Sequence, residues 1–276
     1  MTRILLQISA VAYFAAAAGY GHHVWRSNVR SATVGLWALA LGFGAQTVAV
    51  GYRFMHLGTV PVTTFDGGLA FFAWLVVGIY LVVRGADRLT VIGAVLSPLA
   101  FALTLAAVVL HHDSPAVVPE ELRSAWLPIH VTLAFLGNAV LGLAFAVSVV
   151  YLVQERLLKS HRRGWMIRRL PSLEQLDRLN FRCLAWGFPL LSLGILTGGI
   201  WAAAAWGQFW SWEPREILSL LTWLIYAGLL QFRLTAGLRG RRAATLTILG
   251  FGLVVVSFVS VNLLPLPGRH GAGVGS

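Results

Sequence analysis

Long apolar segments recur along the chain, and short polar segments separate them. A helix rises 1.5 Å per residue, so about twenty apolar residues cross the roughly 30 Å hydrocarbon core of a bilayer. Eight segments come near this length, and they are residues 4–21, 32–52, 67–84, 89–110, 129–153, 183–205, 216–236 and 244–264. The pattern predicts an all-α, polytopic membrane helical bundle of about eight transmembrane helices, with residues 1–276 as a single membrane domain.

Composition agrees with a bilayer environment. Of all residues, 58% are hydrophobic and 11% are charged, and a soluble domain of this size needs more polar surface than that. The first apolar segment is expected to be a membrane helix and not a cleaved signal peptide. One arginine precedes it, and it leads into GYGHHVW without a small-x-small cleavage site before a soluble domain.

The basic residues are distributed unevenly between the two sides of the predicted bundle. The loops after the first, third, fifth and seventh segments hold 16 of the 21 basic residues. The opposite side holds Arg3, Arg53, Arg123, Arg215 and Arg269. Arginine-rich loops stay in the cytoplasm, so the pattern places both termini on the extracytoplasmic side of a plasma (inner) membrane. It also accounts for the net charge of +11 without a nucleic-acid partner.

The longest interruption, at about residues 154–182, is expected to be a basic cytoplasmic segment that contains an amphipathic helix. In its motif PSLEQLDRL, Ser172 is the expected N-cap and Gln175 completes a capping box. Three leucines then fall on one helical face, Leu173, Leu176 and Leu179. Such a helix lies on the anionic inner leaflet of the lipid bilayer or, alternatively, docks a partner.

The stretch WGQFWSWEPREILSL concentrates large rings and charges in one place. It holds three tryptophans, an arginine and two of the ten acidic residues. Pro214 suits the first turn of a helix, and glutamates there complement the helix dipole. Residues at about 206–216 are therefore expected to form an extracytoplasmic loop. One interpretation is an interfacial aromatic belt, although belts are scattered over many helix ends. Rings gathered beside an arginine favour a large flat ligand with carboxylates, such as heme.

Heme iron needs axial ligands, and the sequence offers eight histidines. His130 opens the fifth segment on the extracytoplasmic side, and His270 follows the eighth segment on the same side, so these two can form an axial pair. His56, His111 and His112 also fall on that side. Topology alone therefore leaves the choice of the pair open.

The tryptophan stretch resembles the signature of a known superfamily. The pattern W-G-x-x-W-x-W-D-P-[KR]-E is typical of the heme-handling membrane proteins of cytochrome c maturation, which include CcsA (also called ResC), HemX and, more distantly, CcmC and CcmF. Its matches here are Trp206, Gly207, Trp210, Trp212, Pro214, Arg215 and Glu216. The segment RRLPSLEQLDRLNFRCLAWGFPLL is similar to the CcsA and HemX branch in particular, and the likeness covers most of the chain.

The resemblance implies roles for individual residues. It maps one axial histidine onto His130, within SAWLPIHVTLAF, and the other onto His270, within GRH. It implies that heme b is bound transiently and non-covalently against the tryptophans, with Arg215 on a propionate. The segment FMHLGTVPVTTFDGG resembles an early part of the family pattern, with His56 and Asp66 at its polar positions.

Two positions depart from the family pattern. Glu213 replaces the usual aspartate, which lengthens the side chain and keeps its charge. Gln231 stands where members with the full pathway have a histidine, which the resemblance implies helps to hold heme on its way from the cytoplasm. Glutamine is a poor iron ligand, so this inner heme site is not carried over to the chain.

The leading hypothesis is heme delivery and presentation at the outer membrane face for covalent attachment to apocytochrome c, as a subunit of a cytochrome c synthase or heme lyase. The resemblance implies a CcsB (ResB) type membrane partner, which activity requires. The single cysteine, Cys183, supplies no CxxC pair, so the thiols for attachment come from the substrate. The alternatives are a HemX-like protein that affects heme synthesis or assembly without catalysing attachment, and a quinol-oxidising b-type cytochrome.

Overall fold

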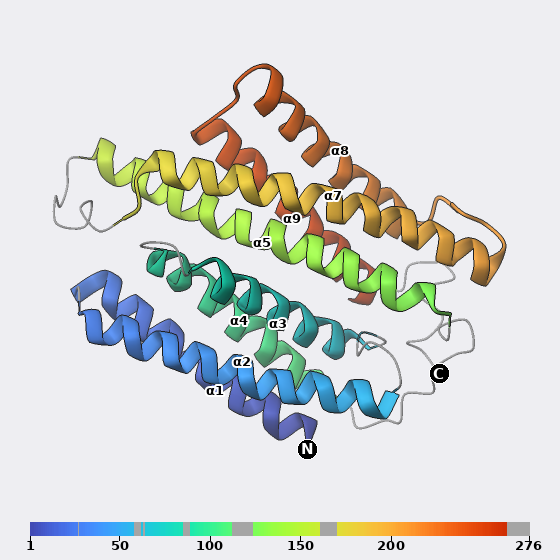
Figure 1. Cartoon of the computed structure of the whole chain (residues 1–276), viewed down its shortest axis with the longest axis horizontal. Coiled ribbons are helices and arrows are strands. Elements are labelled where there is room, and N and C mark those ends of the chain that lie inside the picture. The colour runs from blue at the N-terminus through green and yellow to red at the C-terminus, as the bar shows by residue number, and fades with distance from the viewer. Residues whose placement is uncertain are drawn as a thin grey trace. The chain divides into compact units, whose positions relative to one another are not determined.

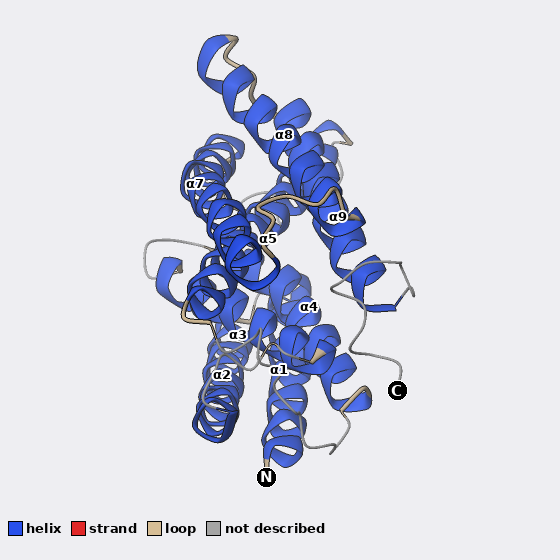
Figure 2. Ribbon diagram, turned by 90° about the vertical axis from the view of Figure 1, so that its right-hand side faces the viewer, coloured by secondary structure: helices blue, strands red, loops and turns tan. Residues whose placement is uncertain are grey.

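The computed structural model describes residues 1–26, 28–57, 62, 64–84, 89–111, 124–160 and 170–263, and over these residues it is helical without a strand (Figures 1 and 2). Its helices are α1 (Thr2–Arg26), α2 (Val29–Leu57), α3 (Phe65–Val83), α4 (Thr90–Val109), α5 (Trp126–Lys159), α7 (Leu173–Trp206), α8 (Pro214–Thr235) and α9 (Arg241–Leu263). The predicted all-α fold is confirmed.

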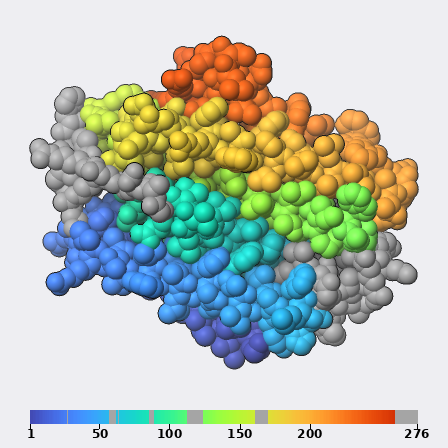
Figure 3. All heavy atoms as spheres, in the orientation of Figure 1, coloured from blue at the N-terminus to red at the C-terminus, as the bar shows by residue number. Residues whose placement is uncertain are grey.

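All eight of these helices are long and apolar enough to cross a membrane, which confirms the eight predicted spans. Many large apolar side chains point outward, among them Trp37, which is 70% exposed, and Val82, which is 82% exposed. The side chains of α2 form part of this outer surface (Figure 3). Such a surface is unfavourable in water and is suited to contact with lipid acyl chains.

Helix α7 begins earlier than the sequence pattern predicts. The predicted capping box is confirmed: the N–H of Ser172 donates to Gln175 Oε1 at 3.0 Å, and the N–H of Gln175 donates to Ser172 Oγ at 3.1 Å. The residues expected to form a separate amphipathic helix are instead the first turns of a 34-residue helix. No glycine or proline interrupts this helix before Gly187. Residues 161–169 of the predicted segment lie outside the described residues.

The chain divides into two compact units, and the expectation of a single membrane domain stays a prediction. Unit 1 comprises Met1–Arg123 and Val149–Leu176, and unit 2 comprises Ser124–Ser148 and Asp177–Ser276. In unit 1, α1 packs on α2 and α4, while α3 packs on α2 and α4. Helices α1 and α2 approach closely where a Cβ on Gly19 would lie 2.9 Å from the backbone of α2, as small residues allow in membrane bundles.

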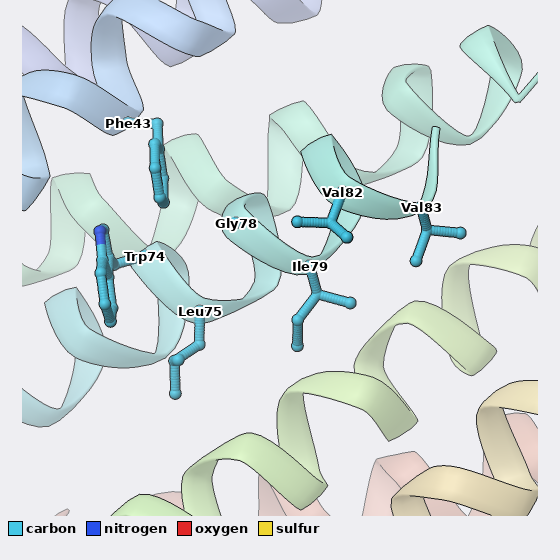
Figure 4. A pocket seen from close by; sticks show the side chains of 7 residues that line it. All are labelled: Phe43, Trp74, Leu75, Gly78, Ile79, Val82 and Val83. Carbon is cyan, nitrogen blue, oxygen red and sulfur yellow. The ribbon is translucent and has the colours of Figure 1, made fainter. Parts of the chain in front are cut away.

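Helices α2 and α3 of unit 1 border an apolar cavity of about 270 Å³ (Figure 4). Phe43 and Trp74 stack at one end of it with ring centroids 5.8 Å apart. The indole N–H of Trp74 donates to Thr47 Oγ1 at 2.8 Å, so the cavity walls offer a ligand almost no polar surface. Nothing in this lining favours a catalytic or metal site.

In unit 2, glycines bring α5 and α7 side by side (Figure 1). A Cβ on Gly137 of α5 would lie 2.7 Å from the backbone N of Leu191 on α7, and a Cβ on Gly194 of α7 would lie 2.9 Å from Ala134 on α5. Helix α8 packs on α9, where Tyr226 is fully buried. The contact between α5 and α7 positions the candidate site.

Candidate functional site

His130 lies about one turn into α5 and points at α7. Its Nδ1 donates to the main-chain carbonyl of Gly194 at 2.7 Å. A carbonyl oxygen only accepts hydrogen bonds, so Nδ1 carries the proton and the lone pair of the neutral ring lies on Nε2. Histidines that bind metals are oriented in this way by a carbonyl or carboxylate on the other ring nitrogen.

The surroundings of His130 fix its ring on two further sides. A Cβ on Gly198 would lie 2.7 Å from His130 Cε1, so only glycine leaves room for the imidazole at that position of α7. The ring of Trp201 lies nearly parallel to the imidazole, with an interplanar angle of 6° and centroids 6.4 Å apart. The histidine is therefore held in one orientation by packing as well as by its hydrogen bond.

Trp201 contacts both His130 and the start of the tryptophan loop, which comprises residues 206–216. It is 6% exposed, and its ring meets Trp206 edge to face at a centroid distance of 4.8 Å. Trp206 ends α7, and Gly207 follows with a φ of 75°, a left-handed conformation that glycine adopts without strain at a helix end. The predicted Trp206 and Gly207 are thus brought to the same end of unit 2 as His130.

Glu216 organises the loop that precedes α8. Its Oε2 accepts the backbone N–H groups of Ser211 and Glu213 at 2.8 and 3.3 Å, and its Oε1 accepts the Ser211 hydroxyl at 3.0 Å. Pro214 begins α8, as predicted. Both oxygens of Glu216 therefore shape the backbone of the loop, and its predicted contact with a ligand stays a prediction.

The rest of the loop offers a ring and a hydrogen-bond donor. Trp212 is 68% exposed and has a φ of 60°, a strained value for a residue with a side chain. Its ring lies 5.9 Å from that of Trp210 at an interplanar angle of 83°. The indole N–H of Trp210 is buried and has no hydrogen-bond partner among the described residues. Arg215, which follows Pro214, is exposed.

The remaining predicted site residues fall elsewhere. His270 lies outside the described residues, so its pairing with His130 stays a prediction. His56 is exposed on α2, and its ring centroid lies 4.1 Å from that of Tyr52. Asp66 lies in unit 1, and its histidine partner there is His111, not His56.

The opposite end of unit 2 carries a paired polar layer beside Gln231. The Arg233 guanidinium donates to Asp177 Oδ2 at 2.8 Å and to Asn180 Oδ1 at 3.0 Å. The amide of Asn180 in turn donates to Ser148 Oγ at 2.8 Å, which joins α5, α7 and α8. Gln231 itself is exposed on α8. His130 is the one histidine of unit 2 within the part of the chain that the structure describes.

These features fit heme better than a bare metal ion. Within the described residues, no three histidine, cysteine or carboxylate side chains gather as a metal-ion site. Heme needs only axial donors, because its porphyrin supplies the other four nitrogens. His130 is oriented as such a donor, and Gly198 leaves room for its imidazole.

Sequence reasoning missed three contributors to this site, Gly194, Gly198 and Trp201. The first two act through a main-chain carbonyl and a missing side chain, so their residue type carries little signal. Trp201 lies in the motif WAAAAW at the end of a predicted span. A tryptophan at that place is expected to be an ordinary residue of the membrane helix, so it gave no signal of a site.

Comparisons with known proteins identify the family of the chain. Residues 63–266 match the family model described as cytochrome C assembly protein. The cytochrome c biogenesis protein CcsA of Synechococcus elongatus is 30% identical over 284 residues, covering 87% of each chain. CcsA of Guillardia theta is 32% identical over 250 residues, covering 82% of this chain and 81% of that relative.

A solved structure shares the fold. The cytochrome c heme lyase CcmF matches with a TM-score of 0.71 at 15% sequence identity, over 99% of this chain and 48% of CcmF. The chain thus spans about half the length of that protein, and at this identity the match concerns the fold alone. The family match over residues 63–266 and the CcsA relatives show that the chain belongs to the cytochrome c assembly protein family.

Proposed function

We propose that the protein delivers heme b and presents it on the extracytoplasmic face of the plasma membrane for covalent attachment to apocytochrome c. It does so as a subunit of a cytochrome c synthase together with a CcsB-type membrane partner. The orientation of His130 toward the tryptophan loop carries this proposal. The family match and the CcsA relatives support it.

In this proposal, different residues of unit 2 contact different parts of the heme. His130 binds the iron through Nε2, because its hydrogen bond to Gly194 places the ring lone pair on that nitrogen. The exposed ring of Trp212 stacks on the porphyrin plane. The guanidinium of Arg215, which is exposed, pairs with a propionate. His270 is the proposed second axial ligand.

Attachment itself draws its thiols from the substrate. Each cysteine S–H of apocytochrome c adds across a heme vinyl group, with sulfur bonding one carbon and hydrogen the other, so the step needs no oxidant. Cys183 is buried in α7 and cannot replace these thiols. The part of this chain is to orient the vinyl groups and keep water from the iron.

The absorption spectrum of the purified chain tests the heme assignment. The wild-type protein from heme-replete membranes is expected to show a b-type spectrum, and His130→Ala should lose it or shift it. Imidazole added to His130→Gly should restore the lost ligand field. His22→Ala removes an exposed histidine of α1 and serves as the control. A His130→Ala spectrum identical to wild type would reject the ligand assignment.

A HemX-like role in heme synthesis or assembly is the second candidate, and Gln231 favours it. This residue stands where the resemblance implies an inner histidine, and its side chain is exposed on α8. Co-expression with a CcsB-type partner and a reporter apocytochrome c separates the two roles. A synthase subunit matures the reporter, whereas a HemX-like protein binds heme and leaves the reporter without it.

A further inference from the structure

Two adjacent glycines of α7 make space for side chains from two different parts of unit 2. Gly198 leaves room for the imidazole of His130, and Gly199 leaves room for the ring of Phe209 in the tryptophan loop. Successive residues of a helix point about 100° apart, because 3.6 residues complete one turn. His130 and Phe209 therefore meet neighbouring faces of the same turn of α7.

The contact between Phe209 and Gly199 is close. A Cβ on Gly199 would lie within 2.7 Å of three ring atoms of Phe209, namely Cζ, Cε1 and Cε2. Real Cβ atoms essentially never approach other atoms closer than 3.0 Å. Because all three atoms are at the outer end of the ring, this part of the ring covers the glycine. Any side chain at position 199 would therefore displace the Phe209 ring.

Phe209 lies between two other restraints on the tryptophan loop. At the start of the loop, the ring of Trp206 packs edge to face on Trp201 of the same helix. Near the end of the loop, Glu216 accepts two backbone N–H groups. The ring of Phe209 adds a contact between the middle of the loop and α7. Loss of this contact would let the middle of the loop move relative to the helix.

The turn of α7 that holds Phe209 also holds the candidate iron ligand. Trp201 lies three residues after Gly198, and its ring is nearly parallel to the imidazole of His130. One helical turn, residues 198–201, thus contacts His130 and two side chains of the tryptophan loop. Because α7 is helical throughout this turn, its backbone fixes the spacing between the histidine and the loop.

An interfacial aromatic belt accounts for less of this arrangement. Phe209 is 48% exposed, and a ring that only marks the membrane surface needs the right depth and no particular neighbour. A glycine directly beneath the ring is an additional requirement that a belt does not explain. The family pattern W-G-x-x-W leaves position 209 open, so the sequence gives this residue no signal.

We propose that Phe209, packed on Gly199, is a positioning residue that fixes the tryptophan loop relative to His130 before heme binds. A loop that is already held in its binding position loses less conformational entropy when the ligand arrives, so the ligand binds more tightly. The inference rests on the proposed function for the identity of the ligand, and it adds the pair of residues that holds the loop in place.

Hydrogen exchange of the heme-free full chain tests the contact itself. Two backbone N–H groups of the loop donate to Glu216, so their exchange reports how often the loop opens. Phe209→Ala removes the ring and Gly199→Ala displaces it, and both variants should exchange these groups several-fold faster. The half-exposed ring can swing outward, so Gly199→Ala retains the fold. Gly228→Ala is the control, because a Cβ there meets nothing within 4 Å.

The double variant Gly199→Ala/Phe209→Ala shows whether the two residues act through each other. Without the ring, a methyl group at position 199 has no Phe209 atoms to displace. The double variant should therefore exchange like Phe209→Ala alone. Additive effects of the two substitutions would mean that the residues act independently, and this would overturn the inference.

Heme titration followed by absorbance measures the consequence for the ligand. Phe209→Ala and Gly199→Ala are expected to bind heme about 2–10-fold more weakly, which corresponds to ordering one further side chain on binding. The absorption maximum of bound heme should stay that of wild type, because neither variant changes His130 or its neighbours at Gly194 and Gly198. Phe232→Ala removes an exposed phenylalanine of α8 and is the control.

The two measurements separate this inference from the proposed function. Faster exchange with unchanged heme affinity would overturn the inference and leave the proposed function in place. Unchanged exchange in Phe209→Ala would overturn it as well. A wild-type chain that binds no heme would reject the proposed function and this role of Phe209 together, whereas exchange would still report the contact with Gly199.

Discussion

Two histidines of this molecule are oriented through the same ring nitrogen but by different acceptors. His130 donates to the main-chain carbonyl of Gly194, and His111 donates to the carboxylate of Asp66, each over 2.7 Å. A carboxylate can take up the proton and carries a charge, whereas a carbonyl does neither. The comparison teaches that one type of side chain is oriented by an uncharged group in unit 2 and by an ionic group in unit 1.

The surroundings of the two histidines extend the contrast. His130 lies beside a glycine and the flat ring of Trp201, so its neighbourhood is uncharged and aromatic. His111 shares its acceptor with Arg53, so its neighbourhood is ionic. Variants that alter each neighbourhood separately test what each contributes to stability and to heme binding.

The largest expected effect comes from removing the carboxylate of unit 1. Asp66→Ala leaves Arg53 and His111 without their shared acceptor, and breaking a buried pair costs about 3–5 kcal/mol. Unfolding in SDS, followed by circular dichroism, measures this loss. Glu155→Ala breaks the pair with Lys159, whose side chain is 65% exposed, and is expected to cost under about 1 kcal/mol. Equal losses for the two variants would contradict a buried charge cluster.

The second effect concerns the orientation of His130. Gly198→Ala places a Cβ 2.7 Å from His130 Cε1, so the ring must move, and heme affinity is expected to fall by about 10–100-fold, as for other changes behind a metal ligand. Heme titration followed by absorbance measures this. Gly252→Ala is the matched control, because a Cβ there meets nothing within 4 Å. Unchanged affinity in Gly198→Ala would argue against His130 as the ligand.

A smaller effect is expected at Trp201. Replacement by leucine removes the ring contacts with His130 and Trp206, which are worth about 0.5–1.5 kcal/mol, and should weaken heme binding and shift its absorption band. Trp201→Phe keeps an aromatic ring and should recover most of the loss. Trp186→Leu, on the same helix and 72% exposed, is the control. A shift of the same size in that control would show a general change in α7.

The smallest effect is expected at Gln231. Because this side chain is exposed on α8, Gln231→Ala should change the free energy of unfolding by less than about 0.5 kcal/mol. The heme spectrum should stay that of wild type. Loss of part of the bound heme in Gln231→Ala would instead place a second heme site beside this residue.

The helices were predictable because the bilayer imposes their length. Each apolar run near twenty residues became a helix, and the Ser172 capping box and the Pro214 helix start lie where the sequence predicts them. The start of α7 was not predictable from hydropathy, because charged residues such as Glu174 and Arg178 reduce hydropathy without disfavouring a helix.

The site was predictable only where residue type carries the chemistry. His130 and the tryptophans of the loop stand out by type and position. The acceptor at Gly194 does not, since every residue has a carbonyl and this one lies 64 residues from the histidine. Likewise, the sequence places Asp66 and His56 in one segment, while the fold joins Asp66 to a histidine at the far end of α4.

The main-chain acceptor of His130 has a consequence for inheritance. Substitutions at the positions around Gly194 change side chains and leave its main-chain carbonyl in place, so they do not delete the group that orients this imidazole. The carboxylate that aims His111 disappears with one altered base in the codon of Asp66. Lineages that drift apart are therefore expected to keep the geometry of the first histidine longer than that of the second.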